Sequence, residues 1–284
     1  MEQILIKNAR ILTMEGETIE NGWLLSENKK ISALGRMPDC PPAEKAIDAE
    51  GGWLLPGLID AHSHIGLYED SIGFEGADGN EDTDPASPQL RALDGVNPMD
   101  PAFREALEAG VTTVLISPGS ANPIGGQIVA MKTAGRRVDD MLIREPAAMK
   151  FALGENPKSV YHDKDETPVT RMAVAAIIRE QLFQAQEYRT RKEKAAIDND
   201  TDEPDFDMKF EALLPVLRGE IPAHFHAHRS DDIFTALRIC REFNLQPVII
   251  HGTAGHLIAD ALTEEQVPVI SGPFLTDRSK PELR

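Results

Sequence analysis

The sequence predicts an α/β fold: a TIM-like (β/α) barrel, incomplete at about seven strands, with a small N-terminal β-sandwich part. From Leu58 onward, short apolar runs alternate with longer amphipathic stretches, which is the pattern of βαβ units around a parallel sheet. The chain has 284 residues, and an α/β barrel uses roughly 250 residues in a single unit. One large domain and one small one therefore account for the length.

Residues 1–56 form the small β domain in this prediction, as one part of a composite β-sandwich. They contain short strand-like runs, a hairpin turn near Glu27–Lys29 and no helical period. Residues 57–284 form the barrel. Its strand runs are LIDAHSHI, VTTVLIS, QIVAMKTA, AAMKFALG, AHFHAHR, PVIIHG and VPVISG. The interval 67–100 is long, polar and rich in Gly, Asp and Pro, so we expect an active-site loop there.

Composition limits the classes of function. The chain is 41% hydrophobic and 27% charged, with a net charge of −18, which argues against nucleic acid or an anionic membrane as a partner. The two cysteines, Cys40 and Cys240, signal neither a disulfide framework nor a cysteine zinc site. No signal peptide or membrane span is recognisable. We expect a cytoplasmic protein that acts on a small molecule.

Histidines stand at the ends of the strand runs. His62 and His64 end the first run, and His226 and His251 lie late in the fifth and sixth. Residues i and i+2 of a strand point to one face, and strand ends in a parallel barrel converge on one face. Neutral imidazole is the commonest metal-ligating side chain. The sequence therefore predicts a metal site built from several strands.

Four segments resemble a known family. LLPGLIDAHSHI resembles the start of the barrel in the amidohydrolase superfamily. MKFALGENPKSVY, HFHAHRSDDI and VIIHGTAGH are similar to the imidazolonepropionase-like branch, which also includes proline- and arginine-releasing dipeptidases. The resemblance spans nearly the whole chain. It implies a metal-dependent hydrolase of amide-type C–N bonds in a dipeptide, a cyclic amide or an N-acyl compound.

The resemblance also implies a ligand set of two divalent metal ions. His62 and His64 would hold one ion, and His226 and His251 the other. Lys150 would bridge them as a carbamate formed with carbon dioxide. Spacing alone does not select Lys150 over Lys132. Zinc is the expected metal, with manganese or iron as alternatives, and a metal-bound hydroxide would attack the carbonyl.

The cluster HFHAH needs a choice among its histidines. In a continuing strand, His224 and His228 would be about 13 Å apart, so they cannot share one ion. Similarity to the family selects His226 as the ligand. We expect His228 and Arg229 to contact the substrate and His224 to pack lower in the barrel. His256 is expected on a helix surface, and His162 has no assigned partner.

The acid–base residue is not identified. The family uses an aspartate after an eighth strand, and no eighth strand run follows VPVISG. Asp277 lies in the loop after that run and is a weak candidate. The chain is therefore interpreted as truncated before strand eight, and as inactive or nearly so without that part. Association with the missing C-terminal segment, or a homo-oligomer, would cover the open sheet edges.

Two other functions stay open. The chain can be a catalytically inactive fragment or scaffold that retains a metal site. It can also be a deaminase of the same superfamily, although a deaminase needs a glutamate three residues after the strand-five histidine. Here Arg229 follows His226 at that spacing, and Asp231 follows His228. The motif GSANPIGGQ lacks the Lys-Ser/Thr of a phosphate cradle, so we expect a substrate-facing or structural loop.

Overall fold

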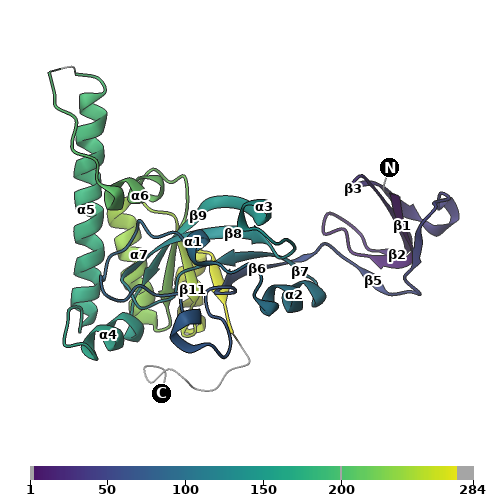
Figure 1. Ribbon diagram of the computed structural model, residues 1–284, viewed down its shortest axis with the longest axis horizontal. Coiled ribbons are helices and arrows are strands. Elements are labelled where there is room, and N and C mark those ends of the chain that lie inside the picture. Colours follow the sequence, from purple (N-terminus) through teal and green to yellow (C-terminus); the bar gives the residue numbers. More distant parts are fainter. Residues whose placement is uncertain (1–2, 199, 274–284) are drawn as a thin grey trace. The chain divides into compact units, whose positions relative to one another are not determined.

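The computed structural model describes residues 3–198 and 200–273 (Figure 1). The chain forms two compact units, Met1–Leu58 and Ile59–Arg284. The boundary lies two residues after the one expected from sequence. Among the described residues, no helix is long and apolar enough to cross a membrane.

The first unit is a single five-stranded sheet. Its main strand order is β3-β2-β1-β4, and β5 also pairs with β1. The elements are β1 (Gln3–Ile11), β2 (Ile19–Glu27), β3 (Lys30–Arg36), the 3-10 helix η1 (Met37–Asp39), β4 (Ala46–Asp48) and β5 (Trp53–Leu54). Asn28 and Lys29 have φ angles of 51° and 65°, which is the two-residue turn that matches strand twist. The described residues supply one layer of the expected sandwich.

The second unit contains a seven-stranded sheet in the order β12-β11-β10-β9-β8-β7-β6. Its strands are β6 (Leu58–Ser63), β7 (Val111–Ile116), β8 (Ile124–Lys132), β9 (Leu142–Ala152), β10 (Ala223–Ala227), β11 (Pro247–His251) and β12 (Val269–Ser271). The strands β9 to β12 run parallel to one another. This sheet agrees with the predicted incomplete barrel of about seven strands.

One strand runs against the prediction of a parallel sheet. β8 is antiparallel to both β7 and β9. The connection from β7 to β8 is the segment 117–123, and a parallel crossover needs a dozen or more residues. The reversal has a consequence for the site. It places the start of β8, where the 117–123 loop ends, beside the carboxyl end of β9.

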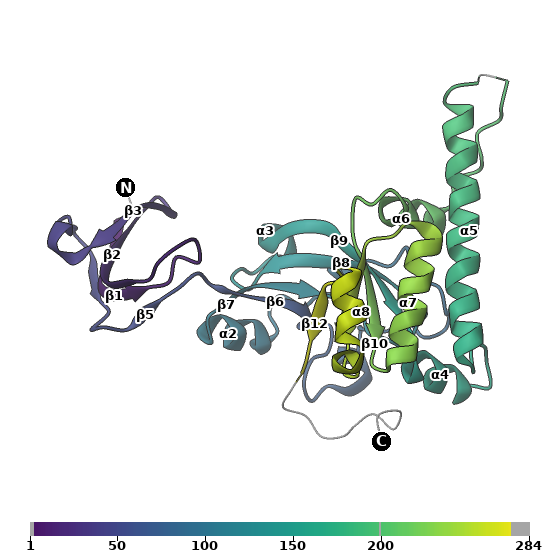
Figure 2. The ribbon, with the colours of Figure 1, turned by 180° about the vertical axis from the view of Figure 1, so that it is seen from behind.

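Helices pack on the outside of the parallel strands. The α-helices are α1 (Ala92–Gly95), α2 (Pro101–Glu108), α3 (Val138–Met141), α4 (Glu155–His162), α5 (Arg171–Ala195), α6 (Met208–Leu217), α7 (Ser230–Phe243) and α8 (Ala259–Glu264), with 3-10 helices η2 (Gly73–Gly76) and η3 (Gly255–Ile258). In Figures 1 and 2, α5 and α7 lie side by side, and α7 is the nearer to the sheet. Thr170 caps α5 by accepting a hydrogen bond from the Ala173 amide.

The core lies between these helices and the strands β9 to β11. Phe151 and Phe225 are opposite each other on β9 and β10, and their rings stack with centroids 4.7 Å apart. Both belong to a cluster of buried residues that includes Ile178 and Leu182 of α5 and Ile233 of α7. Because side chains alternate along a strand, the neighbours of these phenylalanines point to the opposite, inner face of the sheet.

The sheet curls like a barrel wall. β6 is one edge strand, and β11 is next to the other edge. The rings of His62 on β6 and His251 on β11 nevertheless lie only 5.3 Å apart. Neighbouring strands are about 4.8 Å apart in a sheet, so a flat sheet would separate these two strands by five such steps. The curvature brings residues from both ends of the sheet into one site.

Candidate metal centre

Four strands carry the predicted ligands to one edge of the sheet. His62 is on β6, and His64 follows that strand directly. Lys150 lies near the end of β9, His226 near the end of β10, and His251 is the last residue of β11. Because β9, β10 and β11 are parallel, their carboxyl ends meet at the same edge, where barrel proteins build their sites.

The histidine rings form a continuous cluster. The ring centroids of His62 and His64 are 5.0 Å apart, and those of His62 and His251 are 5.3 Å apart. His251 is in turn 4.7 Å from His226. The structure thus brings together the four histidines that the sequence predicts as ligands.

His228 belongs to the same cluster. Its ring lies 4.7 Å from that of His226 and stacks on that of His251 at 4.8 Å. The ligand atoms of these three histidines all lie within 4.8 Å of one another, so the group can hold a metal ion. The expectation that His228 lies apart from the ligands assumed a strand that continues to residue 228. β10 ends at Ala227, so His228 does not have the extended spacing of a strand residue, and its ring can lie beside those of His226 and His251.

Two backbone carbonyls fix the orientation of two rings. His64 Nδ1 donates to the Ser117 carbonyl at 2.7 Å, and His251 Nδ1 donates to the Gly272 carbonyl at 2.6 Å. A carbonyl oxygen only accepts, so Nδ1 carries the proton in both rings and Nε2 carries the lone pair. This arrangement is typical of metal-ligating histidines, whose other nitrogen donates to a carbonyl or carboxylate.

Two hydroxyl groups lie within hydrogen-bond distance of two further rings, those of His226 and His228. The Ser120 Oγ lies 2.9 Å from His226 Nδ1, and the Thr253 Oγ1 lies 2.9 Å from His228 Nδ1. Ser120 is 8% exposed and His226 is 3% exposed, so the first pair is buried. The sequence analysis missed Ser120 and Thr253, although Ser120 lies within the motif GSANPIGGQ that it singled out.

Lys150 is fully buried, with 0% of its surface exposed, and its Nζ has no hydrogen-bond partner among the described residues. Lys132, the other lysine considered, is exposed. Burial lowers the pKa of Lys150 to about 7. A buried amine without a hydrogen-bond partner costs free energy in an ordinary core. The position of Lys150 therefore fits a site in which its amine binds or is joined to a further chemical group.

Electrostatics favour neutral imidazoles at the site. Burial, followed by the charge of Lys150, lowers the pKa of His64 to about 4 and that of His224 to about 4. The same two causes lower the pKa of His62 still further. Neither ring nitrogen of His62 has a hydrogen-bond partner among the described residues. Metal ligands must be deprotonated, and a bound cation would satisfy the one nitrogen of a neutral His62 ring that carries a lone pair.

The glycines of the GSANPIGGQ motif allow β8 to approach its neighbours closely. A Cβ added at Gly125 would lie 3.3 Å from the Lys150 Cγ. Gly126 has a φ of +124°, and a Cβ there would lie 2.6 Å from the Leu90 carbonyl oxygen. Together with Ser120, these glycines give the motif a structural role in shaping the histidine site.

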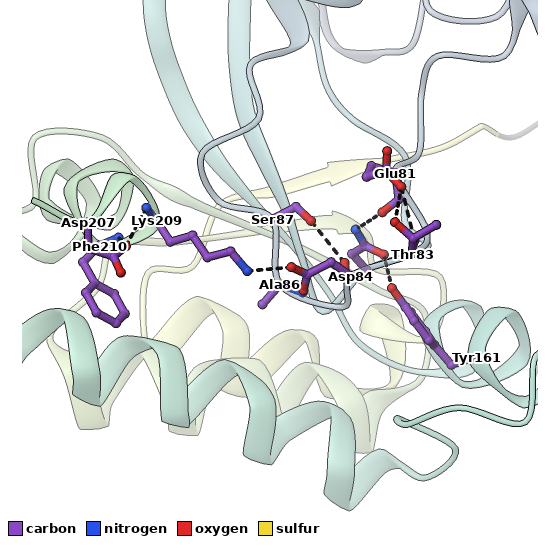
Figure 3. A network of polar contacts seen from close by, with 10 residues as sticks. Glu81, Thr83, Asp84, Ala86, Ser87, Tyr161, Asp207, Lys209 and Phe210 are labelled. Atoms are coloured by element: carbon purple, nitrogen blue, oxygen red, sulfur yellow. Dashed lines mark hydrogen bonds and ion pairs between the residues drawn. The ribbon is translucent and has the colours of Figure 1, made fainter.

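The long loop of residues 67–100 anchors the segment that carries Ser120. Asn80 Oδ1 accepts from the Ala121 amide at 3.1 Å. The Asn122 side chain donates to the Glu81 carbonyl at 2.6 Å and accepts from the Tyr161 hydroxyl at 2.8 Å. Figure 3 shows Tyr161 on α4 reaching this network. The predicted active-site loop therefore helps to hold the segment that carries Ser120 in position beside the histidines.

The same network ties the loop to α6. Lys209 Nζ donates to the Asp84 carboxylate at 2.6 Å, and Ser87 Oγ donates to the Asp84 carbonyl at 3.1 Å (Figure 3). Asp207 caps α6 by accepting from the amides of Lys209 and Phe210. The loop is thus held at α4 and at α6.

The remaining predicted residues lie at the margin of the site. Arg229 forms a bidentate ion pair with Asp231 at 2.7 and 2.9 Å. His256 and His162 are exposed, as expected for His256. Asp277 lies outside the described residues.

Comparison with known proteins identifies the family. No family model matches the chain. A crystal structure of an amidohydrolase from Thermotoga maritima MSB8 superimposes with a TM-score of 0.93 and 44% sequence identity, covering 99% of this chain and 73% of the other. The chain belongs to the amidohydrolase superfamily. A prolidase complexed with N-methylphosphonate-L-proline superimposes with a TM-score of 0.51 at 16% identity, and shares the amidohydrolase fold.

Curated relatives of this amidohydrolase carry several activities in their names. Amidohydrolase tasK of Hapsidospora irregularis is 31% identical over 299 residues, which is 91% of this chain and 30% of that protein. An adenine deaminase of Listeria monocytogenes is 29% identical over 171 residues, which is 59% of this chain and 24% of that protein. The chain thus spans a third or less of the length of these curated relatives.

Proposed function

We propose that this amidohydrolase is a metal-dependent hydrolase that cleaves an amide-type C–N bond. The observation that carries the proposal is the cluster of His62, His64, His226 and His251 at the ends of three strands, β6, β10 and β11. The hydrogen bonds to the Ser117 and Gly272 carbonyls support it, because they turn Nε2 of His64 and His251 into lone-pair donors.

The chain's own residues would divide the work as follows. His62 and His64 would hold one divalent ion, and His226 and His251 would hold a second. Lys150, as a carbamate, would supply oxygen ligands. When bound, the ions lower the pKa of water and polarise a carbonyl group. His228 lies in contact with His226 and His251, so it serves either as a further ligand or as a group that faces the substrate.

The expected substrates are a dipeptide, a cyclic amide or an N-acyl compound. A cavity of about 430 Å³ borders Asp60, His62, His64 and His251, and small-molecule sites are usually about 300–1,000 Å³. The site is therefore matched in size to a small molecule rather than to a folded protein. Zinc is the proposed metal.

The test is a metal titration coupled to hydrolysis. The purified protein is stripped with a chelator, reloaded with zinc or manganese, and assayed on dipeptides, lactams and N-acyl amino acids. The assay compares this chain with a version extended through an eighth strand, which would supply the aspartate that the family resemblance implies. We expect the extended version to show hydrolysis that depends on added metal and disappears in its His226→Asn variant. The His162→Asn variant is the matched control, since His162 is exposed on α4. Metal binding by the extended version without hydrolysis of any compound would favour the scaffold alternative.

Deamination is the second candidate, because a relative named adenine deaminase matches 171 residues. The residue three positions after His226 is Arg229, which is paired with Asp231. A cationic side chain cannot take the acid–base role of a glutamate at that position. Adenine belongs in the substrate panel, and release of ammonia from adenine would replace the hydrolase proposal.

A further inference from the structure

We propose that His224 is a positioning residue that donates a hydrogen bond from Nδ1 to a carbamate on Lys150. The inference rests on the proposed function, because it assigns a role to a residue outside the metal ligands. It follows from the position of His224 and Lys150 in the sheet and from the unsatisfied nitrogens that both bury there.

His224 and Lys150 are direct neighbours across two strands. They are paired in the parallel register of β10 and β9, so their Cα atoms are about 4.8 Å apart and their side chains leave the same face of the sheet. The next pair in register, Phe225 and Phe151, stacks in the helix-facing core. His224 and Lys150 therefore share the inner face of the barrel with His226.

Both side chains bury a polar nitrogen that has no hydrogen-bond partner in the described part of the chain. His224 is 4% exposed and Lys150 is 0% exposed. Neither His224 Nδ1 nor Lys150 Nζ has a hydrogen-bond partner among the described residues. Buried polar groups in folded proteins are nearly always hydrogen-bonded, so two adjacent exceptions indicate that an acceptor is added between them.

A carbamate is an acceptor that fits this position. The neutral amine nitrogen of Lys150 attacks the carbon of carbon dioxide. An N–C bond forms while one C=O π bond opens and leaves its electron pair on oxygen, and one N–H proton leaves to solvent. The product carries one negative charge on two oxygens. A neutral imidazole has one N–H, and a hydrogen bond to a charged acceptor is about twice as strong as one between neutral groups. The Nδ1–H group of His224 would donate to one oxygen of the carbamate. Carbamate lone pairs would remain available to the metal ions.

The experiment measures carbamate directly. The zinc-loaded protein is equilibrated with 13C-bicarbonate, and the carbamate signal is followed by 13C NMR as bicarbonate is varied. The Lys150→Ala variant assigns the signal. His224→Leu removes the donor at similar volume, whereas His224→Asn keeps an N–H donor near the position of Nδ1. His162→Asn, on exposed α4 surface, is the control.

We expect His224→Leu to need at least about tenfold more bicarbonate for half-maximal signal, as for the loss of one hydrogen bond to a charged group. His224→Asn should restore most of the loss, and thermal unfolding of the metal-free Leu variant should occur at the same temperature or higher. An unchanged bicarbonate requirement in His224→Leu overturns the inference while the proposed carbamate stands. If the wild-type protein shows no 13C signal that is lost in Lys150→Ala, the carbamate itself is refuted. That result overturns both the role of His224 and the proposed carbamate.

Discussion

His226 Nδ1 and Ser120 Oγ lie 2.9 Å apart in the buried interior, although 106 residues separate them in the chain. Ser120 is on the loop that follows β7 and leads into β8, and the first residue of β8, Ile124, pairs with Phe151 near the carboxyl end of β9. The contact therefore lies at the carboxyl ends of β7, β9 and β10. It also links the histidine cluster to the long loop of residues 67–100, through the hydrogen bond of Ala121 to Asn80.

Ser120→Ala should weaken metal binding. The hydroxyl orients the His226 ring, and loss of such an outer partner typically costs about 10–100-fold in metal affinity. We expect this loss in a competition titration with a zinc chelator. Ser159→Ala, on the exposed side of α4, should leave the affinity unchanged. Equal affinity in the two variants would show that the Ser120 contact does not orient the ligand.

Tyr161→Phe should affect both stability and metal binding. The buried Tyr161 hydroxyl donates to Asn122, and leaving a buried acceptor unsatisfied costs about 1–3 kcal/mol. Asn122 is two residues from Ser120, so a shifted loop also disturbs His226. Urea unfolding gives the stability change, and the chelator competition gives the affinity.

Tyr188→Phe provides the comparison for that variant. The Tyr188 hydroxyl donates to Glu211 between α5 and α6, on helices outside the histidine cluster. The Tyr188→Phe substitution should lower the free energy of unfolding without changing the metal affinity. A loss of affinity as large as that in Tyr161→Phe would mean that general destabilisation, rather than loop position, explains both.

Lys150→Ala should remove metal, whereas Lys132→Ala should not. Lys150 is fully buried beside the histidines, and Lys132 is exposed at the end of β8. Metal content after dialysis, measured by mass spectrometry of the metal, separates the two. We expect at least one of the two proposed ions to be lost from the Lys150 variant. Full metal content in that variant would refute the bridging role.

The histidine site could be predicted from the sequence because its signals are local. His62 and His64 have the two-residue spacing of a strand, and His226 and His251 each stand late in an apolar run. Strand ends in an α/β barrel converge, so the fold class alone placed them together. The same spacing links His226 to His228, but the assumption of a continuing strand hid the proximity of His228 to His251.

The direction of β8 could not be read from its residues. An apolar run has the same alternation in either direction, so a pattern of side chains does not distinguish parallel from antiparallel pairing. The short connection of residues 117–123 carried the signal, since it is too short for a crossover. The contacts of Ser120 and Tyr161 join segments that no local pattern relates.

The stability of the metal-free protein should fall as the pH drops from about 6.5 to 4. Burial, followed by the charge of Lys150, lowers the pKa of His224 from 6.5 to about 4. In that window the unfolded chain binds a proton at residue 224 that the folded protein does not, so the contribution of His224 to stability rises with pH there and is constant above pH 6.5. One pKa unit corresponds to about 1.4 kcal/mol, so His224 contributes about 3 kcal/mol across the window.

His224→Leu tests this pH dependence, because it removes one titrating group and leaves His64, whose pKa is also lowered to about 4. Urea unfolding of chelator-treated protein at several pH values should give a shallower slope between pH 4 and 6.5 for the variant than for the wild type. The two should have parallel pH profiles above pH 6.5, where the imidazole is neutral in both the folded and the unfolded chain. An identical slope in both proteins would mean that the pKa of His224 is the same in the folded and the unfolded chain, and that burial does not keep this ring neutral between pH 4 and 6.5.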